Sequence, residues 1–452
     1  MRSVAAFAAV SVTLGVLLSA GCGGASSSGG GPEAAGAVTG GAEVPIFEWD
    51  PTWPTLPLPN RWAIGNVIGI DVDSQDHVWI LHRPRTLLHG QEDDASYPIP
   101  ESDCCVPAPA VIEFDQQGHV VQAWGGPGSE YEWPLFRGQA SSTEVIREPP
   151  APPTAAPGAR VRVNLFGTQR TKRTEGPPLN YPWPESEHTL FLDHKGNVWV
   201  GNNGGSHILK MTRDGAFVLQ IGRAHVPREE RGSNVLDAFN APAGLIVDPA
   251  TNEVYVADGY ENRRVIVFDA DTGTYKRHWG AYGKPPDDTV PPRPVPFVWK
   301  PTDPKSTQFS VVHSVRIDKD GLVYVGDRNN SRIQVFTKDG TYIKEAYIRP
   351  TTVRGSVLDF VFSRDPEQRF VFVGDGRNDK VWILRRSDLR VIGEFGFTSH
   401  WGGGFSIIHN IAVDSKNNLY VTESLEGKRA QKFSYKGLGP QTRQYDEHGM
   451  ER

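Results

Sequence analysis

The sequence predicts an all-β fold, a six-bladed β-propeller, from three observations. A unit of four short strands recurs six times, in copies that begin near Val67, His188, Ala243, His313, Val357 and His409. Within these copies, segments such as KGNVWVGN and DGLVYVGDRNNSRIQVF alternate apolar and polar residues with the period of two that is typical of strands. No segment has a sustained helical pattern. Six such units, each packing its faces on its neighbours, form a ring of blades.

Residues 1–22 have the form of a bacterial lipoprotein signal. Arg2 precedes an apolar run that ends at Leu18, and LSAGC ends at Cys22. We expect Cys22 to be lipidated; simple secretion is the alternative, because Leu18 lies one position further upstream than the lipoprotein box prefers. The apolar run is shorter than the roughly 20 residues of a spanning helix. We therefore expect an exported protein, lipid-anchored in the cell envelope, and Gly23 favours the outer membrane and the periplasm.

The remaining chain divides into a tether, a propeller and a tail. Residues 23–43 are rich in Gly and Ser and are expected to be a flexible tether. The propeller is expected over residues 44–440, with a C-terminal tail over 441–452. Val44–Asp50 (VPIFEWD) is the candidate for the extra strand that closes the last blade.

Two insertions interrupt the repeat, at about 84–107 and 125–187. The first contains Cys104 and Cys105, which have no other partner in the mature chain. In an oxidising compartment they either bond to each other or stay free, and we favour a vicinal disulfide that stiffens the loop. The second insertion is rich in Pro, and its end, NYPWPESE, runs into His188 and is expected to cover one mouth of the central channel.

The charge distribution argues against a nucleic-acid partner. The net charge is −6, and the 47 Lys and Arg residues are scattered rather than clustered. We therefore expect no basic groove, and no contact with the membrane other than the lipid anchor.

Three histidines occupy one register of the repeat, in alternate copies. His188, His313 and His409 each lie five residues before the acidic residue that begins a strand-to-strand turn. The intervening copies carry Ile68, Ala243 and Leu358 at this register. In a ring, imidazoles from every second blade converge on the central axis. This is the donor set of a three-histidine metal site with one open position.

Several motifs in these copies resemble one known family. They are LHRPRT, EHTLFLDHKGNVWV, YVADGYENRRVIVFD, VVHSVRIDKDGLVYVGDRNNSRIQVF and IIHNIAV. The units resemble NHL repeats, and their series resembles the peptidylglycine α-hydroxy amidating lyases, from about Val67 to Phe433. The resemblance implies an NHL-type propeller in which the three histidines hold a catalytic zinc. It also implies that Tyr260 is the base and that Arg83 and Arg328 bind the substrate carboxylate.

The sequence departs from that family at two positions beside the third histidine. Ile407 stands where the family has methionine, which changes the edge of the pocket. Asn410 stands where the family has an aspartate that helps to hold a structural calcium, so Asn410 is a candidate Ca²⁺ ligand that carries no charge. This chain has no copper monooxygenase domain, the usual partner of the lyase. The expected substrate is therefore a small molecule or a peptide with a carboxylate.

The residue chemistry agrees with these roles. Three neutral imidazoles leave zinc a Lewis-acid position. A phenol is a poor base at neutral pH, so Tyr260 needs a neighbouring cation, and Arg83 and Arg328 supply one as well as carboxylate recognition. The predicted reaction is the cleavage of the C–N bond of a carbinolamide, which releases an amide and glyoxylate.

Other interpretations stay open. The chain could be a non-catalytic NHL propeller that binds or scaffolds, or a metal-dependent lactonase or hydrolase, although that class would favour acidic and amide ligands on the axis. Tyr260 could pack between blades, and Arg83 and Arg328 could be exposed at blade edges. The recurring aspartates are interpreted as turn formers, namely Asp73, Asp193, Asp248, Asp318 and Asp414. The remaining histidines of note are expected at the surface, namely His82, His89, His194 and His207.

Overall fold

A computed structural model describes residues 43–87, 104–126, 136–137, 183–184, 186–291 and 299–452. The predicted signal with Cys22, nearly all of the tether, most of both insertions, and His89 lie outside these residues. In the described part, no helix is long and apolar enough to cross a membrane.

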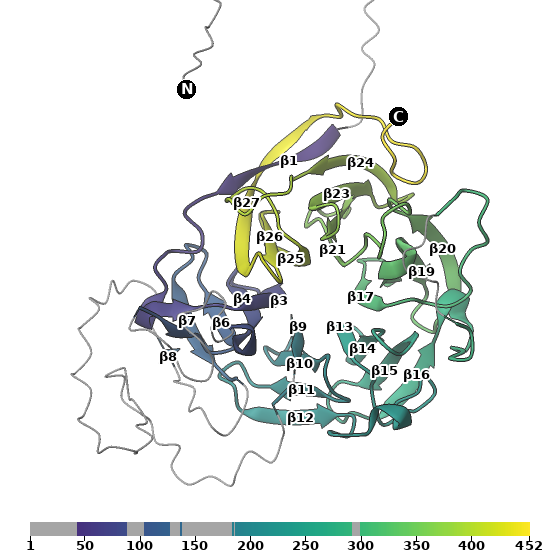
Figure 1. Ribbon diagram of the computed structural model, residues 1–452, viewed down its shortest axis with the longest axis horizontal. Coiled ribbons are helices and arrows are strands. Elements are labelled where there is room, and N and C mark those ends of the chain that lie inside the picture. The colour runs from purple at the N-terminus through teal and green to yellow at the C-terminus, as the bar shows by residue number, and fades with distance from the viewer. Residues whose placement is uncertain (1–42, 88–103, 127–135, 138–182, 185, 292–298) are drawn as a thin grey trace, which may run out of the picture. The chain divides into compact units, whose positions relative to one another are not determined.

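The described strands form six antiparallel blades around a ring (Figure 1). Blade 1 contains β3 (Asn66–Val72), β4 (Val78–Arg83), β6 (Val111–Phe114), β7 (Val120–Trp124) and β8 (Phe136–Arg137). Blade 2 contains β9 (Glu187–Leu192), β10 (Val198–Asn202), β11 (Ile208–Met211) and β12 (Phe217–Ile221). Blade 3 contains β13 (Pro242–Asp248), β14 (Glu253–Asp258), β15 (Arg264–Asp269) and β16 (Tyr275–Trp279).

The second half of the ring repeats this order. Blade 4 contains β17 (Val312–Ile317), β18 (Val323–Asp327), β19 (Arg332–Phe336) and β20 (Tyr342–Tyr347). Blade 5 contains β21 (Asp359–Phe362), β22 (Phe370–Asp375), β23 (Lys380–Arg385) and β24 (Arg390–Phe395). Blade 6 contains β25 (Ile408–Val413), β26 (Leu419–Glu423), β27 (Arg429–Pro440) and β1 (Glu43–Asp50). The predicted fold class is confirmed, and β8 adds a fifth strand to blade 1.

The ring is closed by the strand that the sequence suggested. β1 runs antiparallel to β27, with Glu43 opposite Pro440 and Asp50 opposite Lys432. The last blade therefore combines strands from both ends of the folded region, which leaves the first strand, β25, facing the central axis like the first strand of every other blade (Figure 1).

Apolar side chains pack between neighbouring blades. In a propeller, each blade lies between two others, so both of its faces are covered. One core cluster joins Trp199 and Ile208 of blade 2 to Val254 and Ile266 of blade 3. The recurring aspartates stabilise the turns between the first and second strands of their blades. Asp193, for example, accepts hydrogen bonds from the backbone of Lys195 and Asn197 and from the Trp199 indole at 3.0 Å. These side chains are structural, as the sequence suggested.

Short segments complete the described chain. β2 (Trp62–Ala63) pairs in parallel with β5 (Val106–Pro107), close to where the sulfur atoms of Cys104 and Cys105 are joined. The 3₁₀ turns are η1 (Pro59–Arg61), η2 (Pro84–Thr86), η3 (Arg228–Glu230), η4 (Ala281–Gly283) and η5 (Arg328–Asn330). Of the segment expected over the channel, Trp183 packs edge-on against Trp124.

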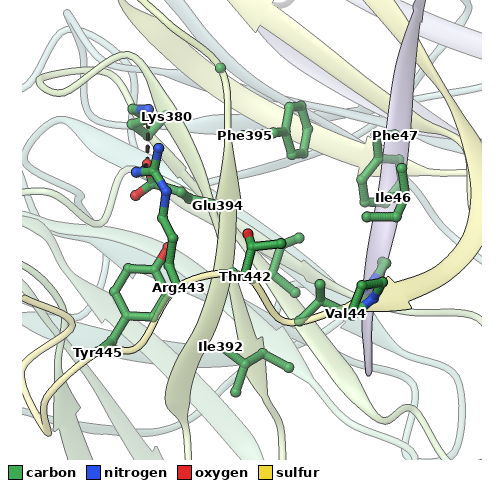
Figure 2. Close-up of a pocket in the computed structure, with 15 residues that line it drawn as sticks. Val44, Ile46, Phe47, Lys380, Ile392, Glu394, Phe395, Thr442, Arg443 and Tyr445 are labelled. Carbon is green, nitrogen blue, oxygen red and sulfur yellow. Dashed lines mark hydrogen bonds and ion pairs between the residues drawn. The ribbon is translucent and has the colours of Figure 1, made fainter. Parts of the chain in front are cut away.

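The C-terminal segment folds back on the outer strands of blade 5. With β1 and β24 it encloses a cavity of about 360 Å³, shown in Figure 2. Glu394 binds Lys380 at 3.0 Å and Arg443 at 2.9 Å at one end of it. None of the predicted site residues lines this cavity. The ion pair between Glu394 and Arg443 therefore joins the C-terminal segment to blade 5, and the cavity is separate from the predicted site on the axis.

Candidate functional site

The three histidines meet at the centre of the ring. His188, His313 and His409 lie on β9, β17 and β25, the innermost strands of blades 2, 4 and 6. Their ring centroids are 4.7 to 5.2 Å apart, and one nitrogen of each lies within 4.8 Å of the other two. All three side chains are buried. The structure thus brings together the residues that the register of the repeat selected.

Carbonyl oxygens orient the three imidazoles. Nδ1 of His188 lies 2.8 Å from the carbonyl oxygen of Ala243, and Nδ1 of His313 lies 2.6 Å from that of Leu358. For His409 the partner of Nδ1 is the Asn410 side-chain oxygen, at 2.5 Å. Ala243 and Leu358 are apolar residues at the histidine register of the intervening blades. The three oxygens accept the Nδ1 protons, which leaves each Nε2 with its lone pair toward the axis.

The electrostatic environment keeps the three imidazoles neutral. Burial lowers the pKa of His188 and His313 well below the ordinary value, and lowers that of His409 to about 3. The nearby charges of Arg83 and Arg328 act in the same direction. Neutral imidazoles with fixed tautomers are the form that binds a metal ion. Donor type, spacing and protonation state therefore all fit a zinc ion.

Tyr260 lies directly beside this donor set. Its hydroxyl is 3.0 Å from Nε2 of His188 and 3.1 Å from Nε2 of His313. It follows β14 in a turn held by Asp258, which accepts hydrogen bonds from the Asn262 amide at 2.8 Å and the Arg264 guanidinium at 2.9 Å. Because Asp258 and Arg264 are fully buried, the turn is rigid where it presents the phenol.

Arg328 contacts the phenol from blade 4. Its Nη1 donates to the Tyr260 hydroxyl at 3.2 Å, and its guanidinium lies 5.1 Å from the centre of the tyrosine ring. The turn of Arg328 repeats the construction of the Tyr260 turn, since Asp327 pairs with Arg332 at 2.7 Å. A positive charge at this position stabilises a phenolate. Tyr260 and Arg328 are thus placed at the site rather than on a blade edge.

Arg83 approaches from blade 1. Its Nε donates to the carbonyl oxygen of Glu187 at 2.6 Å, directly before His188. Its charge lowers the pKa of His188 and His409 and interacts favourably with Tyr260. The structure therefore brings five of the six predicted residues together on the axis, and it places Arg83 beside them through its contact with the residue before His188.

Asn410 is engaged on both sides of its amide. Its Oδ1 lies 2.5 Å from Nδ1 of His409, and its Nδ2 donates to Asp359 at 3.0 Å. Asp359 in turn pairs with Arg316 at 2.8 Å. In this arrangement Asn410 orients a histidine, and its ligation of calcium stays a prediction.

Two of the histidines expected at the surface are buried. His82 is at the end of β4, where its Nε2 donates to the Pro109 carbonyl at 2.9 Å and its Nδ1 accepts from Gly65. Burial lowers the pKa of His82 to about 4. His207 is buried as well, whereas His194 is exposed. The expectation was wrong because the partners of His82, Gly65 and Pro109, come from segments that flank the strands of blade 1, which the alternating strand pattern does not place.

A second group of potential ligands is held by an internal cation. Asp73, His77 and Glu113 lie close together in blade 1, with His77 2.7 Å from Glu113. Arg213 of blade 2 pairs with both carboxylates, at 2.6 Å for Asp73. The guanidinium pairs with both carboxylates where a metal ion would bind, which makes it a link between blades 1 and 2.

Sequence reasoning missed Arg377, which lies on the same side of the ring. Its charge interacts with those of Arg328 and Arg354 and favourably with Tyr260. A signal was present, because Asp375-Gly376-Arg377 has the same form as Asp258-Gly259-Tyr260 at the end of the second strand of a blade.

Comparison with known proteins agrees with this geometry. Residues 309–336 match the family model of the NHL repeat. This segment contains His313 and Arg328. The chain is a six-bladed propeller in which one segment of blade 4 matches the NHL repeat. It is 30% identical over 247 residues to the mouse protein peptidyl-glycine alpha-amidating monooxygenase, which covers 52% of this chain and 22% of the mouse protein.

Two further relatives are matched over a larger share of their own length. A probable peptidyl-alpha-hydroxyglycine alpha-amidating lyase of Caenorhabditis elegans is 26% identical over 243 residues, or 52% of this chain and 60% of the relative. The human NHL repeat-containing protein 3 is 25% identical over 260 residues, or 55% of this chain and 67% of the relative. The similarity is thus to amidating enzymes and to NHL proteins, over about half of this chain.

Proposed function

We propose that the protein is a zinc-dependent lyase that cleaves the C–N bond of an α-hydroxylated, carboxylate-bearing amide to an amide and glyoxylate. The observation that carries the proposal is the Tyr260 hydroxyl, 3.0 and 3.1 Å from Nε2 of two neutral axial histidines and 3.2 Å from a guanidinium. A base, a cation and a metal-binding group meet there at hydrogen-bond distance. The similarity to amidating enzymes supports the same reaction class.

The Nε2 atoms of His188, His313 and His409 would hold the zinc ion. Zinc would supply a Lewis acid that stabilises negative charge on a substrate oxygen. The backbone carbonyls that fix the Nδ1 protons of His188 and His313 keep these imidazoles in register for it.

The chain's own residues then bind and deprotonate the substrate. Arg328 and Arg83 bind the carboxylate, for which a guanidinium offers two parallel donors. Tyr260, as phenolate, removes the proton of the α-hydroxyl group. The oxygen electron pair forms the carbonyl of glyoxylate, the C–N bond breaks, and its electron pair remains on nitrogen. The Tyr260 hydroxyl returns the proton to that nitrogen, so atoms and charge balance.

The remaining expectations belong to the same proposal. Cys22 would carry the lipid that holds the enzyme in the bacterial envelope, on the periplasmic side of the outer membrane. Asn410 would be a ligand of structural calcium. The substrate would be a small molecule or a peptide that reaches this compartment.

Two measurements on the purified wild-type protein test the proposal. Metal analysis should find about one zinc per chain. Glyoxylate should be released from α-hydroxyhippurate, stop when zinc is removed by a chelator and resume when zinc is returned. A protein that contains no zinc after careful preparation and releases no glyoxylate would be a non-catalytic binding propeller instead.

A further inference from the structure

Arg377 occupies in blade 5 the position that Tyr260 occupies in blade 3. Both residues follow an acidic residue and a glycine at the end of the second strand, β22 and β14. A Cβ atom on Gly259 would lie 2.2 Å from the backbone nitrogen of Val312, and one on Gly376 would lie 2.1 Å from the carbonyl oxygen of Ile408. Each turn is therefore packed against the residue that precedes an axial histidine, which explains why only glycine fits there.

Two neighbouring loops hold this turn beside Arg328. The Asn378 side chain donates to Thr352 at 2.9 Å, which joins the Arg377 turn to the loop between β20 and β21. In that loop, Gly355 packs directly on the carbonyl group of Arg328 and adopts φ +79°. Arg354 precedes Gly355 and is exposed. The turns that carry Arg354 and Arg377 are thus held beside Arg328, and both arginine side chains are exposed.

These arginines have no carboxylate partners in the described part of the chain. Neither Arg354 nor Arg377 forms a side-chain hydrogen bond or an ion pair there, and Arg328 contacts only Asn329 and Tyr260. The arginines at the start of the third strands of blades 3 and 4 are paired with aspartates: Arg264 with Asp258, and Arg332 with Asp327. Arg377 is exposed, but partial desolvation of its guanidinium and the charges of Arg328 and Arg354 lower its pKa, because adjacent unpaired cations repel each other. A cost of this kind is typical of a binding site that an anion completes.

We propose that Arg377, assisted by Arg354, is a specificity determinant that binds a second anionic group of the substrate. Arg83 and Arg328 bind the carboxylate next to the reacting carbon. The second group is a carboxylate on the acyl portion, so the substrate class is an N-acyl α-hydroxyglycine derived from a dicarboxylic acid. The proposal rests on the proposed function for the reaction, but its test does not.

Binding of unreactive ligands tests the proposal by calorimetry on the full-length wild-type protein. N-succinylglycine and N-succinamoylglycine lack the hydroxyl group and differ only in a terminal carboxylate or amide. We expect the wild-type protein to bind N-succinylglycine about tenfold more tightly or better, because a charge-assisted hydrogen bond is lost with the amide. R377Q should bind both ligands about equally, R377K should keep part of the preference, and R354Q should reduce it less than R377Q does.

R390Q is the matched control, because Arg390 is an exposed arginine on the outer strand β24 of the same blade. It should keep the wild-type preference. Equal affinities of the wild-type protein for the two ligands, or an undiminished preference in R377Q, would overturn the proposal. Because neither ligand reacts, a protein that prefers the dianion but never releases glyoxylate would refute the lyase function and leave the anion subsite standing.

Discussion

The even-numbered and odd-numbered blades contribute different chemistry to one axis. Blades 2, 4 and 6 present His188, His313 and His409, whereas blades 1, 3 and 5 present apolar side chains at the same register. Two of the odd-numbered blades nonetheless act on the site, because the carbonyls of Ala243 and Leu358 receive the Nδ1 protons of His188 and His313. These two apolar residues therefore orient the histidines through their backbone carbonyls, although their side chains are unreactive.

The odd-numbered blades act a second time, at the ends of their second strands. There they supply Arg83, Tyr260 and Arg377, all of which interact electrostatically with the site. Blade 4 is the exception among the even-numbered blades, since its second strand leads into Arg328. Under the proposed function, metal binding and substrate handling are divided between alternate blades, with Arg328 of blade 4 as the exception.

The strongest test of this division removes one ligand. His313→Ala should lose zinc and lower glyoxylate release by about a thousandfold or more, because Lewis-acid stabilisation is worth several kcal/mol. Leu358→Ala is the control at the same register of an odd-numbered blade, where the backbone carbonyl survives and where blade 3 already has Ala243. Elemental analysis measures the zinc content of the two variants, and the glyoxylate assay measures their activity. An active, zinc-loaded His313→Ala protein would refute the site.

The next test separates substrate chemistry from metal binding. Tyr260→Phe should retain zinc but lower kcat about 10²- to 10⁴-fold, the usual worth of general acid–base catalysis. Tyr435→Phe, on β27 in the outer part of blade 6, is the matched control and should behave like the wild-type protein. If Tyr260→Phe lost zinc and kept its turnover, the tyrosine would belong to the metal site instead.

A third test compares the three turns that carry Tyr260, Arg328 and Arg377. Asp258 and Asp327 pair with buried arginines, whereas Asp375 has none, since Lys380 binds Glu394. Burial raises the pKa of Asp375 from 3.8 to about 6. The folded state therefore binds this proton more tightly than the unfolded state, and Asp375 makes the free energy of unfolding rise as the pH falls from about 7 to about 4.

Asp375→Asn should remove up to about 3 kcal/mol of this rise in urea unfolding measured across the same pH range. Asp339→Asn is the control, because the Thr337 hydroxyl lowers the pKa of this exposed carboxyl and its effect falls below that range. An unchanged slope in Asp375→Asn would contradict the raised pKa of Asp375.

The smallest effect concerns the orientation of the third histidine. His409 has a side-chain acceptor, Asn410, where His188 and His313 have backbone carbonyls. Asn410→Ala should weaken zinc binding about tenfold, as the loss of an orienting partner does. Ser314→Ala changes the residue that follows His313 and is the control. Because the Leu358 carbonyl orients His313, this variant should leave the zinc affinity unchanged. Competition with a chromophoric chelator measures the zinc affinity of both variants. If Asn410→Ala bound zinc as tightly as the wild-type protein does, Asn410 would have no role in orienting His409.

Much of the fold and the site could be predicted, because each rests on a periodic signal. Period-two alternation and six copies of one unit specify a propeller, and the shared register of three histidines specifies their convergence. The burial of His82 could not be predicted, since the Pro109 carbonyl that receives its proton lies 27 residues further along the chain, in a segment without a strand pattern. Arg377 escaped notice because a single Asp-Gly-Arg turn has meaning only beside its counterpart in blade 3.

The sequence by itself determined the strand pattern, the number of blades and which blades carry histidine, because these are properties of spacing along the chain. Only the tertiary structure decided that the carbonyls of Ala243 and Leu358 orient the imidazoles, and that the Tyr260 hydroxyl lies between two of them. Every residue has a carbonyl, so no residue type announces this role. It follows from the close approach of neighbouring blades, which depends on packing between segments distant in the chain.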